Sequence, residues 1–490
     1  MDKMKQWALP AIQALVSVVF MIMLMMSGLF PGKYLALAAV VVAALLLISV
    51  LLARSSNGTA RLISTFYSIF MSGMLVFAMV YVNQVTKTLN SIAGSATEVK
   101  TIAVLVEQGN AANSIEETGG YRFGVYEGTD GELVGETIEE IKAANSDAEL
   151  QRESYESPIE MAQDLIDGKI DAAICNKAYT EILDEVIVDF SSVVRILYEK
   201  EFVTQTDASG SELSADGSTK QQITSEVASH QGQSLTDHAF TVLISGIDVS
   251  GPISATSRSD VNILMTVNPL THQILLTTTP RDYYVYLPGI SGDMRDKLTH
   301  AGIYGVKCSM RTLENLYGIE ISDYIRINFD SLIRLVDALD GVDVYSDYDF
   351  EAGGYHFSRG TNHLNGEEAL AFARERHSFD SGDRQRGKNQ MLVLTAIIDK
   401  LQSPALLKNP SDILEVVRKS MQTSMSSSDI TDMISWQLDT GEDWKIDRQS
   451  VDGTGDSQQT FSMKGTNLYV MWPDEESVES AAERIREVVE

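Results

Sequence analysis

The chain has 490 residues, 44% of them hydrophobic, which is enough for more than one domain with its own core. Its 68 acidic and 38 basic residues give a formal net charge of −30, which argues against nucleic acid or anionic lipid surfaces as binding partners. The two cysteines, Cys175 and Cys308, form neither a disulfide framework nor a zinc-binding spacing, and we expect both to be buried apolar residues.

Three stretches without charge dominate the first 90 residues. They lie between Lys5 and Lys33, between Lys33 and Arg54, and between Arg61 and Lys87. Each is about 20 residues or longer, enough for a helix to cross a hydrocarbon core. A cleaved signal peptide is the alternative for the first stretch, but two more follow it without a small-residue cleavage pattern between them. We therefore predict a membrane region at 1–90 with three transmembrane helices.

The basic residues beside these spans predict their orientation. Lys3 and Lys5 precede the first span and Arg54 and Arg61 follow the second, whereas only Lys33 lies between the first and second. Lys and Arg resist translocation, so the N-terminus is expected in the cytoplasm. The predicted localisation is the cell membrane, multi-pass, with a large extracellular C-terminal region.

Residues 98–203 are predicted to form a small accessory α/β domain. "TEVKTIAVLVEQG" and "YRFGVYEGTD" are typical of strands, and "GETIEEIKAAN" of an amphipathic helix that ends at Asn145. A further helix runs through Gly168 into an apolar strand. The pattern is similar to half of a solute-binding domain, but it contains no phosphate loop or catalytic set, which favours a packing or spacer role.

Residues 204–236 contain no aromatic residue and are rich in Ser, Thr, Gln and Gly, which predicts a linker. The next domain is predicted at 237–490. "FTVLISGIDVSG" indicates a buried strand, and two further strands meet at a turn near Pro269. "DSLIRLVDALDGV" and "LNGEEALAFAR" have helical spacing, the second with a capping box formed by Asn365 and Glu368. The mixture predicts a layered α/β domain.

Charged residues gather at the predicted strand ends of this domain, where α/β proteins usually place their chemistry. They are Asp248, Arg258, Asp260, Arg281 and Asp282. Carboxylates without nitrogen or sulfur ligands suit Mg²⁺, which takes one or two of them and completes its shell with phosphate and water.

A second charged group lies in "FARERHSFDSGDRQRGKNQ", residues 372–390. Arg374 and Arg376 follow a predicted helix, and Arg386 and Gln390 are four apart on a helical face that continues into Leu394. Arginine binds two oxygens of a diphosphate at once and stays charged at any working pH. The cluster therefore predicts a polyanion site, with a solvated helix face held by internal ion pairs as an open alternative.

These residues carry a resemblance to the LytR-CpsA-Psr family. The motifs in order are "ISGID", "SRSDVNILMTVNP", "TPRDYYVYLPG", "INFDSLIRLVDALDGVDV", "LNGEEALAFARER" and "GDRQRGKNQ", over about residues 240–402. Three spans and an extra α/β module before them resemble the streptococcal-type CpsA capsule proteins. The resemblance implies an α/β/α domain with a mixed central sheet. Asp340 departs from the family, which often has Gly there, and Lys388–Asn389–Gln390 departs from the commoner Arg-Gln-Gln.

The resemblance also implies a Mg²⁺-dependent phosphotransferase, with Mn²⁺ as an alternative ion, that moves a glycopolymer, here capsular polysaccharide, from polyprenyl pyrophosphate to a peptidoglycan hydroxyl. Capsule-synthesis proteins are further expected partners. By position, Asp248 and Asp260 would hold the metal. The expected diphosphate site comprises Arg258, Arg281, Arg374, Arg376, Arg386 and Gln390, beside an apolar tunnel for the lipid. The residues expected to be catalytic are Arg281, Arg374, Arg376 and Asp260.

Two other functions stay open on the sequence alone. The extra module and the three spans also suit a non-catalytic membrane sensor that binds lipid-linked glycan and regulates capsule synthesis. A site that admits water in place of an acceptor would act as a polyprenyl-pyrophosphate hydrolase.

Overall fold

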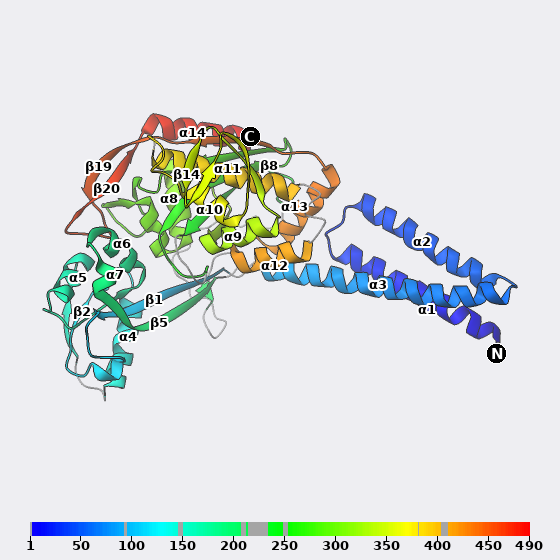
Figure 1. The fold of residues 1–490 in the computed structure, drawn as a ribbon, viewed down its shortest axis with the longest axis horizontal. Coiled ribbons are helices and arrows are strands. Elements are labelled where there is room, and N and C mark those ends of the chain that lie inside the picture. Colours follow the sequence, from blue (N-terminus) through cyan, green and yellow to red (C-terminus); the bar gives the residue numbers. More distant parts are fainter. Residues whose placement is uncertain are drawn as a thin grey trace.

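The computed structural model describes residues 2–92, 96–145, 150–206, 212–213, 234–247, 253–380, 382–402 and 410–490. It has three parts: a bundle of long apolar helices, a small α/β domain and a larger α/β domain (Figure 1). The predicted mixed α/β fold with three N-terminal apolar helices is confirmed.

The three N-terminal helices are long and apolar enough to cross a membrane: α1 (Asp2–Met26), α2 (Gly32–Arg54) and α3 (Gly58–Ile92). They project away from the two domains, with the N-terminus toward the far end (Figure 1). α3 has 35 residues, and at about 1.5 Å per residue it is about 50 Å long, more than the ~30 Å of a hydrocarbon core. Its extra length contacts α12 (Pro410–Ser420) and α13 (Ser427–Thr440) in the larger domain.

The accessory domain is a six-stranded sheet in the order β3-β2-β4-β1-β5-β6. Its strands are β1 (Ala96–Glu107), β2 (Arg122–Val125), β3 (Gln151–Ser154), β4 (Ala172–Asn176), β5 (Val194–Thr206) and β6 (Glu212–Leu213). α4 (Gly131–Ala144) packs on one face, whereas α5 (Pro158–Ile166) and α6 (Ala178–Val186) pack on the other, with the short η1 (Ile115–Glu117) and α7 (Phe190–Val193) beside them. β5 extends three residues into the predicted linker, most of which lies outside the described residues.

The larger domain is built on a second six-stranded sheet in the order β17-β12-β7-β8-β9-β18. The strands are β7 (Phe240–Ile247), β8 (Ser259–Asn268), β9 (Gln273–Thr278), β12 (Asp323–Asn328), β17 (Met421–Thr423) and β18 (Lys445–Ser450). β7 is parallel to β12 and β9 to β18, while the remaining neighbours are antiparallel. The predicted mixed central sheet is therefore confirmed.

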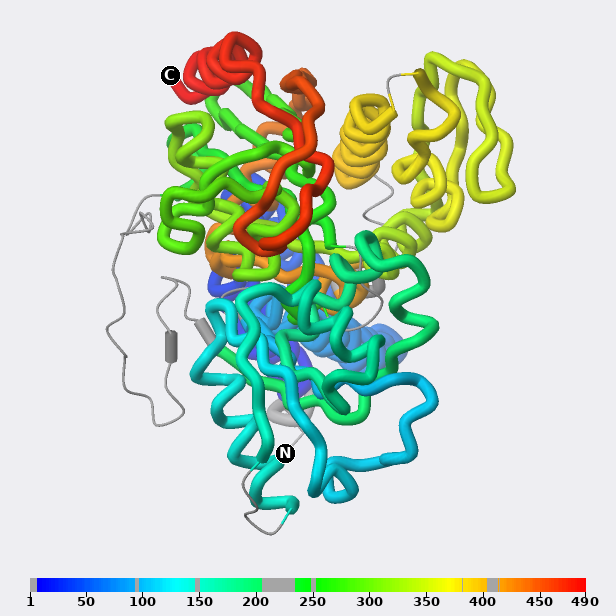
Figure 2. Tube along the Cα trace, turned by 90° about the vertical axis from the view of Figure 1, so that its left-hand side faces the viewer, coloured from blue at the N-terminus to red at the C-terminus, as the bar shows by residue number. Residues whose placement is uncertain are grey.

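Helices cover both faces of this sheet (Figure 2). α8 (Val306–Tyr317) and α14 (Glu475–Val489) pack on one face, and α11 (Asp383–Gln402) packs on the other. Successive strand side chains point to opposite faces, so Leu243 joins the α8 side while Val242 and Ile244 join the α11 side. This alternation produces the predicted α/β/α layers.

A further lobe flanks α11. It contains α9 (Phe329–Ala338), α10 (Gly366–Arg374), β13 (Val342–Ser346), β14 (Phe350–Ala352), β15 (Tyr355–Phe357) and β16 (Gly360–Leu364). The predicted capping box at the start of α10 is present, with Asn365 and Glu368 each bonded to the other's backbone N–H. Asp340 has φ +59°, the left-handed conformation that glycine adopts without cost, which explains why glycine suits this position.

The remaining elements lie outside the central sheet. They are β10 (Tyr284–Tyr286), β11 (Arg295–Lys297), η2 (Leu298–Tyr304), β19 (Gly453–Gln459) and β20 (Asn467–Pro473). Of these, β10 and η2 join the core on the α8 side of the sheet. Both cysteines are free and buried, as predicted, in separate clusters.

The strand that leaves α3 is hydrogen-bonded to the larger domain. The Val99 N–H donates to the Ser254 carbonyl at 2.8 Å, and the Thr256 N–H donates to the Val99 carbonyl at 3.0 Å. Residues 253–256 precede Arg258 and β8. The base of the accessory domain therefore touches the segment that enters the predicted site.

Candidate active site

A polar cavity lies where β8 and β9 end against the start of α11. It encloses about 360 Å³, including its open mouth. The lining residues are Asp260, Thr278, Thr279, Pro280, Arg281, Asp383, Arg384, Arg386, Gly387, Gln390, Ser450 and Val451. Four of the predicted site residues, Asp260, Arg281, Arg386 and Gln390, therefore meet around one space although more than 100 residues separate the first from the last.

Asp260 and Arg281 form the paired centre of this cavity. Nη1 of Arg281 and Oγ1 of Thr299 both donate to Oδ1 of Asp260 at 3.0 Å. Burial alone would raise the pKa of Asp260, but Arg281 and Arg258 outweigh it, so its pKa lies below the ordinary value. Nε of Arg281 is buried without a hydrogen-bond partner among the described residues, which leaves a donor for an anion.

Arg386 brings a second guanidinium to the cavity from the first turn of α11. It contacts Asp383 of the same turn. Burial lowers the pKa of Arg386, and the neighbouring Arg281 and Arg376 act in the same direction. Three positive charges thus lie within electrostatic reach of one another, an arrangement that favours binding of an anion.

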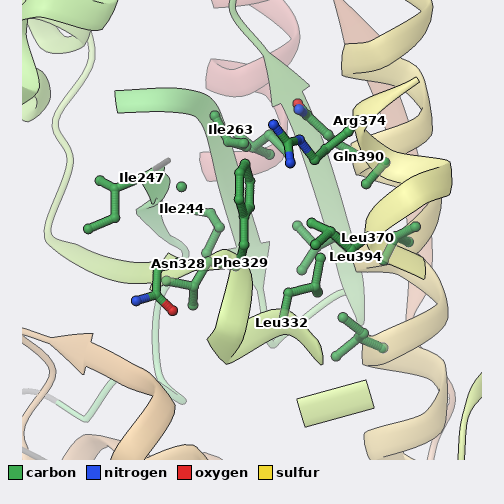
Figure 3. A pocket seen from close by; sticks show the side chains of 16 residues that line it. Ile244, Ile247, Ile263, Asn328, Phe329, Leu332, Leu370, Arg374, Gln390 and Leu394 are labelled. Carbon is green, nitrogen blue, oxygen red and sulfur yellow. The ribbon is translucent and has the colours of Figure 1, made fainter. Parts of the chain in front are cut away.

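An apolar cavity of about 600 Å³, including its open mouth, shares the lining residue Gln390 with the polar one, and Figure 3 shows the side chains that line it. Strands β7, β8 and β12 form one wall, and α9, α10 and α11 form the other. Its residues are Ile244, Gly246, Ile247, Val261, Ile263, Ile327, Asn328, Phe329, Leu332, Leu370, Ala373, Arg374, Gln390, Val393, Leu394 and Ile397. Gln390 lines both cavities, so the α11 face is polar at one end and apolar at the other, as the sequence spacing predicted.

Arg374 ends α10 at the rim of the apolar cavity. Its guanidinium carbon lies 4.3 Å from the centre of the Phe329 ring, a cation–π contact that fixes the side chain. Figure 3 shows Arg374 and Gln390 together at one end of the cavity, with Leu332, Leu370 and Leu394 along its side. Arg376 comes two residues after Arg374 in the sequence and is half-buried. Its Nε donates to His377 Nε2 at 3.4 Å.

Arg258 is placed differently from the other arginines. It is buried just before β8 but lines neither of the two cavities. Its Nε lies 3.3 Å from Glu181 Oε2, and its Nη1 contacts Glu185 Oε1, both carboxylates coming from α6 of the accessory domain. Sequence reasoning missed these two glutamates because nothing in a helix of another domain signals such a contact.

The backbone around Arg258 is held by a close approach of η2. A Cβ built on Gly302 would lie 2.4 Å from the Ser257 carbonyl oxygen and 2.7 Å from the Ser259 nitrogen. Only glycine fits there without moving one backbone against the other. Thr299, which bonds Asp260, lies in the same η2 segment.

Asp260 is the one predicted metal ligand that the structure describes, because Asp248 lies outside the described residues. No group of three or more His, Cys, Asp or Glu side chains that could hold a metal ion occurs in the described part of the chain. Oδ1 of Asp260 is occupied by Arg281 and Thr299, while Oδ2 has no hydrogen bond to a described residue. Since Mg²⁺ needs only one or two carboxylates beside phosphate oxygens, Asp260 fits one ligand position.

Several lining residues were not predicted. Asp383 and Arg384 lie within the cationic segment, and their part in the cavity follows from the first turn of α11. Ser450 arrives at the end of β18, from a region in which the sequence offered no motif. Arg384 Nε also pairs with Asp452 at 2.9 Å, which closes the cavity on that side.

Solved structures with similar folds include the crystal structures of Bacillus subtilis TagU and TagV. TagU is 28% identical, with a TM-score of 0.41, over 52% of this chain and 97% of that one. TagV is 27% identical, with a TM-score of 0.44, over 51% and 97%.

Curated relatives carry the name polyisoprenyl-teichoic acid–peptidoglycan teichoic acid transferase TagU. The protein from Enterococcus faecalis is 35% identical over 227 residues, 46% of this chain and 73% of its own length. The one from Bacillus mycoides is 34% identical over 194 residues, 39% and 62% of the two lengths. The sequence model of the LytR_cpsA_psr family matches residues 202–486, more than half of the chain. This match and the motifs around the two cavities place the chain in the LytR_cpsA_psr family.

Proposed function

We propose that this protein is a membrane-anchored phosphotransferase that moves a glycopolymer from a polyprenyl diphosphate carrier onto a peptidoglycan hydroxyl. The observation that carries the proposal is the shared lining residue Gln390, which joins an arginine-lined cavity to an apolar one. A ligand that fills both must have a compact anionic group next to a long apolar chain. A lipid diphosphate has this composition, and the curated relatives are named for transfer from a polyisoprenyl carrier to peptidoglycan.

The arginines would act on the diphosphate by charge and geometry. Arg281 and Arg386 in the polar cavity, with Arg374 at the apolar rim, would bind the phosphate oxygens and orient the lipid. The acceptor hydroxyl attacks the phosphorus next to the sugar; the new O–P bond forms as the bond to the bridging oxygen breaks, and polyprenyl phosphate leaves. Guanidinium groups placed at the leaving phosphate offset its growing charge.

Asp260 and Asp248 are the two candidates for accepting the hydroxyl proton. A general base works best when its pKa is near the working pH. The lowered pKa of Asp260, which Arg281 and Arg258 cause against the opposing effect of burial, makes it a weak base. We therefore assign Asp260 to holding Arg281 and a metal ion, and Asp248 to two tasks, binding the metal with one carboxylate oxygen and accepting the proton on the other.

We further infer that the metal is Mg²⁺, with Mn²⁺ as a substitute, held by Asp260 and Asp248. When bound, such an ion supplies Lewis acidity to the phosphate oxygens. The protein residues provide the remaining positive charge around the diphosphate, and Thr299 keeps Asp260 oriented.

The membrane arrangement is part of the proposal. The three helices would cross the membrane with the N-terminus inside, which places both domains on the outer face. Capsular polysaccharide is the proposed polymer, because three spans and the accessory domain resemble the architecture of streptococcal-type CpsA proteins. Teichoic acid, which the relatives' names give, is the second candidate.

The full chain in lipid nanodiscs, mixed with Mg²⁺, lipid-linked oligosaccharide and peptidoglycan strands, tests the proposal. We expect glycan to become covalently attached to peptidoglycan, and Arg374→Ala to abolish the transfer. The matched control is Arg359→Ala. Arg359 is an exposed arginine between β15 and β16, and this variant should transfer glycan like the wild type. Capsule-type and teichoic acid-type donors compared in parallel identify the polymer.

Three other results would each contradict a stated part of the proposal. Release of phosphate without transfer indicates a hydrolase, and tight binding without turnover indicates the membrane sensor. Glycan transfer that is undiminished in the presence of EDTA would show that the reaction needs no metal ion.

A further inference from the structure

Helix α6 of the accessory domain brings two carboxylates into contact with the candidate active site. Glu181 and Glu185 are four residues apart, so they lie on one face of α6. Both contact Arg258, Glu181 at Nε and Glu185 at Nη1, and Ser257 Oγ donates to Glu181 at 3.3 Å. Part of the negative charge near the candidate site therefore comes from the accessory domain and not from the larger domain.

The contact between Arg258 and Glu181 is largely shielded from solvent, whereas Glu185 stays partly open to it. The Arg258 side chain is 10% exposed, Glu181 is 26% exposed and Glu185 is 37% exposed. Burial raises the pKa of Glu181 above its ordinary value in spite of the nearby Arg258. A carboxylate kept in such a place affects its neighbours more strongly than one at the open surface, because less water screens it.

The same two glutamates act on the centre of the polar cavity. Glu185 is one of the charges that raise the pKa of Arg281, and Asp260 is one of those that raise the pKa of Glu181. Glu185 therefore attracts Arg281, which we assign to the diphosphate, and Glu181 lies within electrostatic reach of Asp260. By the same Coulombic rule both glutamates repel a diphosphate bound next to Arg281.

We propose that Glu181 and Glu185 are specificity-determining residues of the lipid-diphosphate site. They hold Arg258 in place and offset its charge, so the arginines alone bind anions weakly and the apolar cavity must supply the rest of the affinity. Small free anions such as pyrophosphate are then poorly retained, while an isoprenoid diphosphate, which fills both cavities, is bound. This inference rests on the proposed function, since it assigns the polar cavity to a diphosphate.

Binding measurements on the full chain in detergent micelles test the inference. The probes are farnesyl diphosphate and inorganic pyrophosphate, each titrated into the wild type and into Glu181→Gln/Glu185→Gln. Glutamine keeps the size and the hydrogen-bond acceptor of glutamate but removes the charge. We expect the double variant to bind pyrophosphate about tenfold more tightly and farnesyl diphosphate by a smaller factor, because pyrophosphate has one more ionisable oxygen and is repelled more strongly by the glutamates.

Two controls separate the local effect from a general change in charge. Glu201→Gln removes one negative charge from an exposed position on β5 of the same domain and should leave both affinities unchanged. In an Arg258→Gln background the two glutamine substitutions should tighten binding less, because the charge of Arg258 is no longer there to be released and only the repulsion between the glutamates and the diphosphate is relieved.

The outcomes distinguish this inference from the proposed function. Unchanged or weaker binding in a double variant that unfolds at the wild-type temperature would overturn the inference while leaving the lipid-diphosphate site intact. Failure of the wild type to bind farnesyl diphosphate at all would instead overturn the proposed function and the inference with it.

Discussion

Asp260 and Arg281 face each other across two neighbouring antiparallel strands. In the β8–β9 ladder Ile263 is opposite Thr278, and three further steps along the same register place residue 260 opposite residue 281. The 3.0 Å contact between their side chains thus continues the strand pairing beyond the end of β9. The tight turn near Pro269 fixes this register. Because this turn lies at the opposite end of the hairpin, it sets which residues face each other in the site.

Replacement of Arg281 by lysine should weaken diphosphate binding at least about tenfold, although the charge is kept. A lysine ammonium has no planar fork, so the donors that remain once it bonds Asp260 do not point where Nε of Arg281 does. Calorimetric titration of farnesyl diphosphate measures the effect. Arg152→Lys, at an exposed position on β3, is the control; equal losses in both variants would contradict a specific role for Arg281.

Filling the apolar cavity should separate recognition of the chain from recognition of the diphosphate. Leu370→Trp inserts a larger side chain into the cavity, so farnesyl diphosphate should bind at least about tenfold more weakly. Inorganic pyrophosphate, which needs only the polar cavity, should bind as before. Leu401→Trp adds the same bulk at an exposed position of α11 and should change neither affinity.

The lowered pKa of Asp260 predicts how the stability difference between wild type and Asp260→Asn varies with pH. Burial opposes ionisation, but Arg281 and Arg258 prevail, so the folded protein binds the proton less readily than the unfolded chain does. The stabilisation is therefore complete above the ordinary pKa of about 3.9 and is lost as pH falls through the lowered native value.

Thermal unfolding of the full chain at a series of pH values measures that difference. We expect the wild type to exceed Asp260→Asn by roughly 1–3 kcal/mol at neutral pH, because asparagine removes the counter-charge nearest to buried Arg281 and leaves the more distant Asp282. The difference should shrink only below about pH 4. A gap that already closes between pH 7 and pH 5 would contradict the assignment of a depressed pKa.

Gly302→Ala should destabilise the larger domain by about 1–3 kcal/mol, because the new methyl group meets backbone atoms of Ser257 and Ser259. The unfolding midpoint reports the loss. Gly135→Ala, in the middle of α4 with open space at its Cβ, should be neutral or stabilising. A Gly302→Ala protein as stable as the wild type would show that η2 moves aside freely.

Local sequence patterns were enough to predict the parts of the site that belong to one element or one hairpin. The four-residue spacing of Arg386 and Gln390 predicted a shared helical face, and the apolar run "FTVLISGIDVSG" predicted the buried strand β7. The capping box at Asn365 fixed the start of α10 and hence the position of Arg374 at its end. In each case the physical cause acts over a few residues.

Contacts between distant elements could not be predicted in the same way. Glu181 and Glu185 have the appearance of ordinary exposed helix residues until α6 packs beside Arg258. Leu401 continues the helical spacing of Leu394 and Ile397, yet it is 37% exposed, since it lies one residue from the end of α11. These features depend on how whole elements pack, which no short pattern records.

The hydrogen bonds between Val99 and residues 254–256 connect the end of α3 to the segment that leads to Arg258. The part of α3 that exceeds the hydrocarbon thickness, about 20 Å, lies against α12 and α13, so the helix would hold the larger domain close to the level of the lipid headgroups. A carrier lipid keeps its phosphates at that headgroup level, so only the glycan strands nearest the membrane come within range. The length of one helix would thus select the innermost layer of the wall as the place where the polymer is attached.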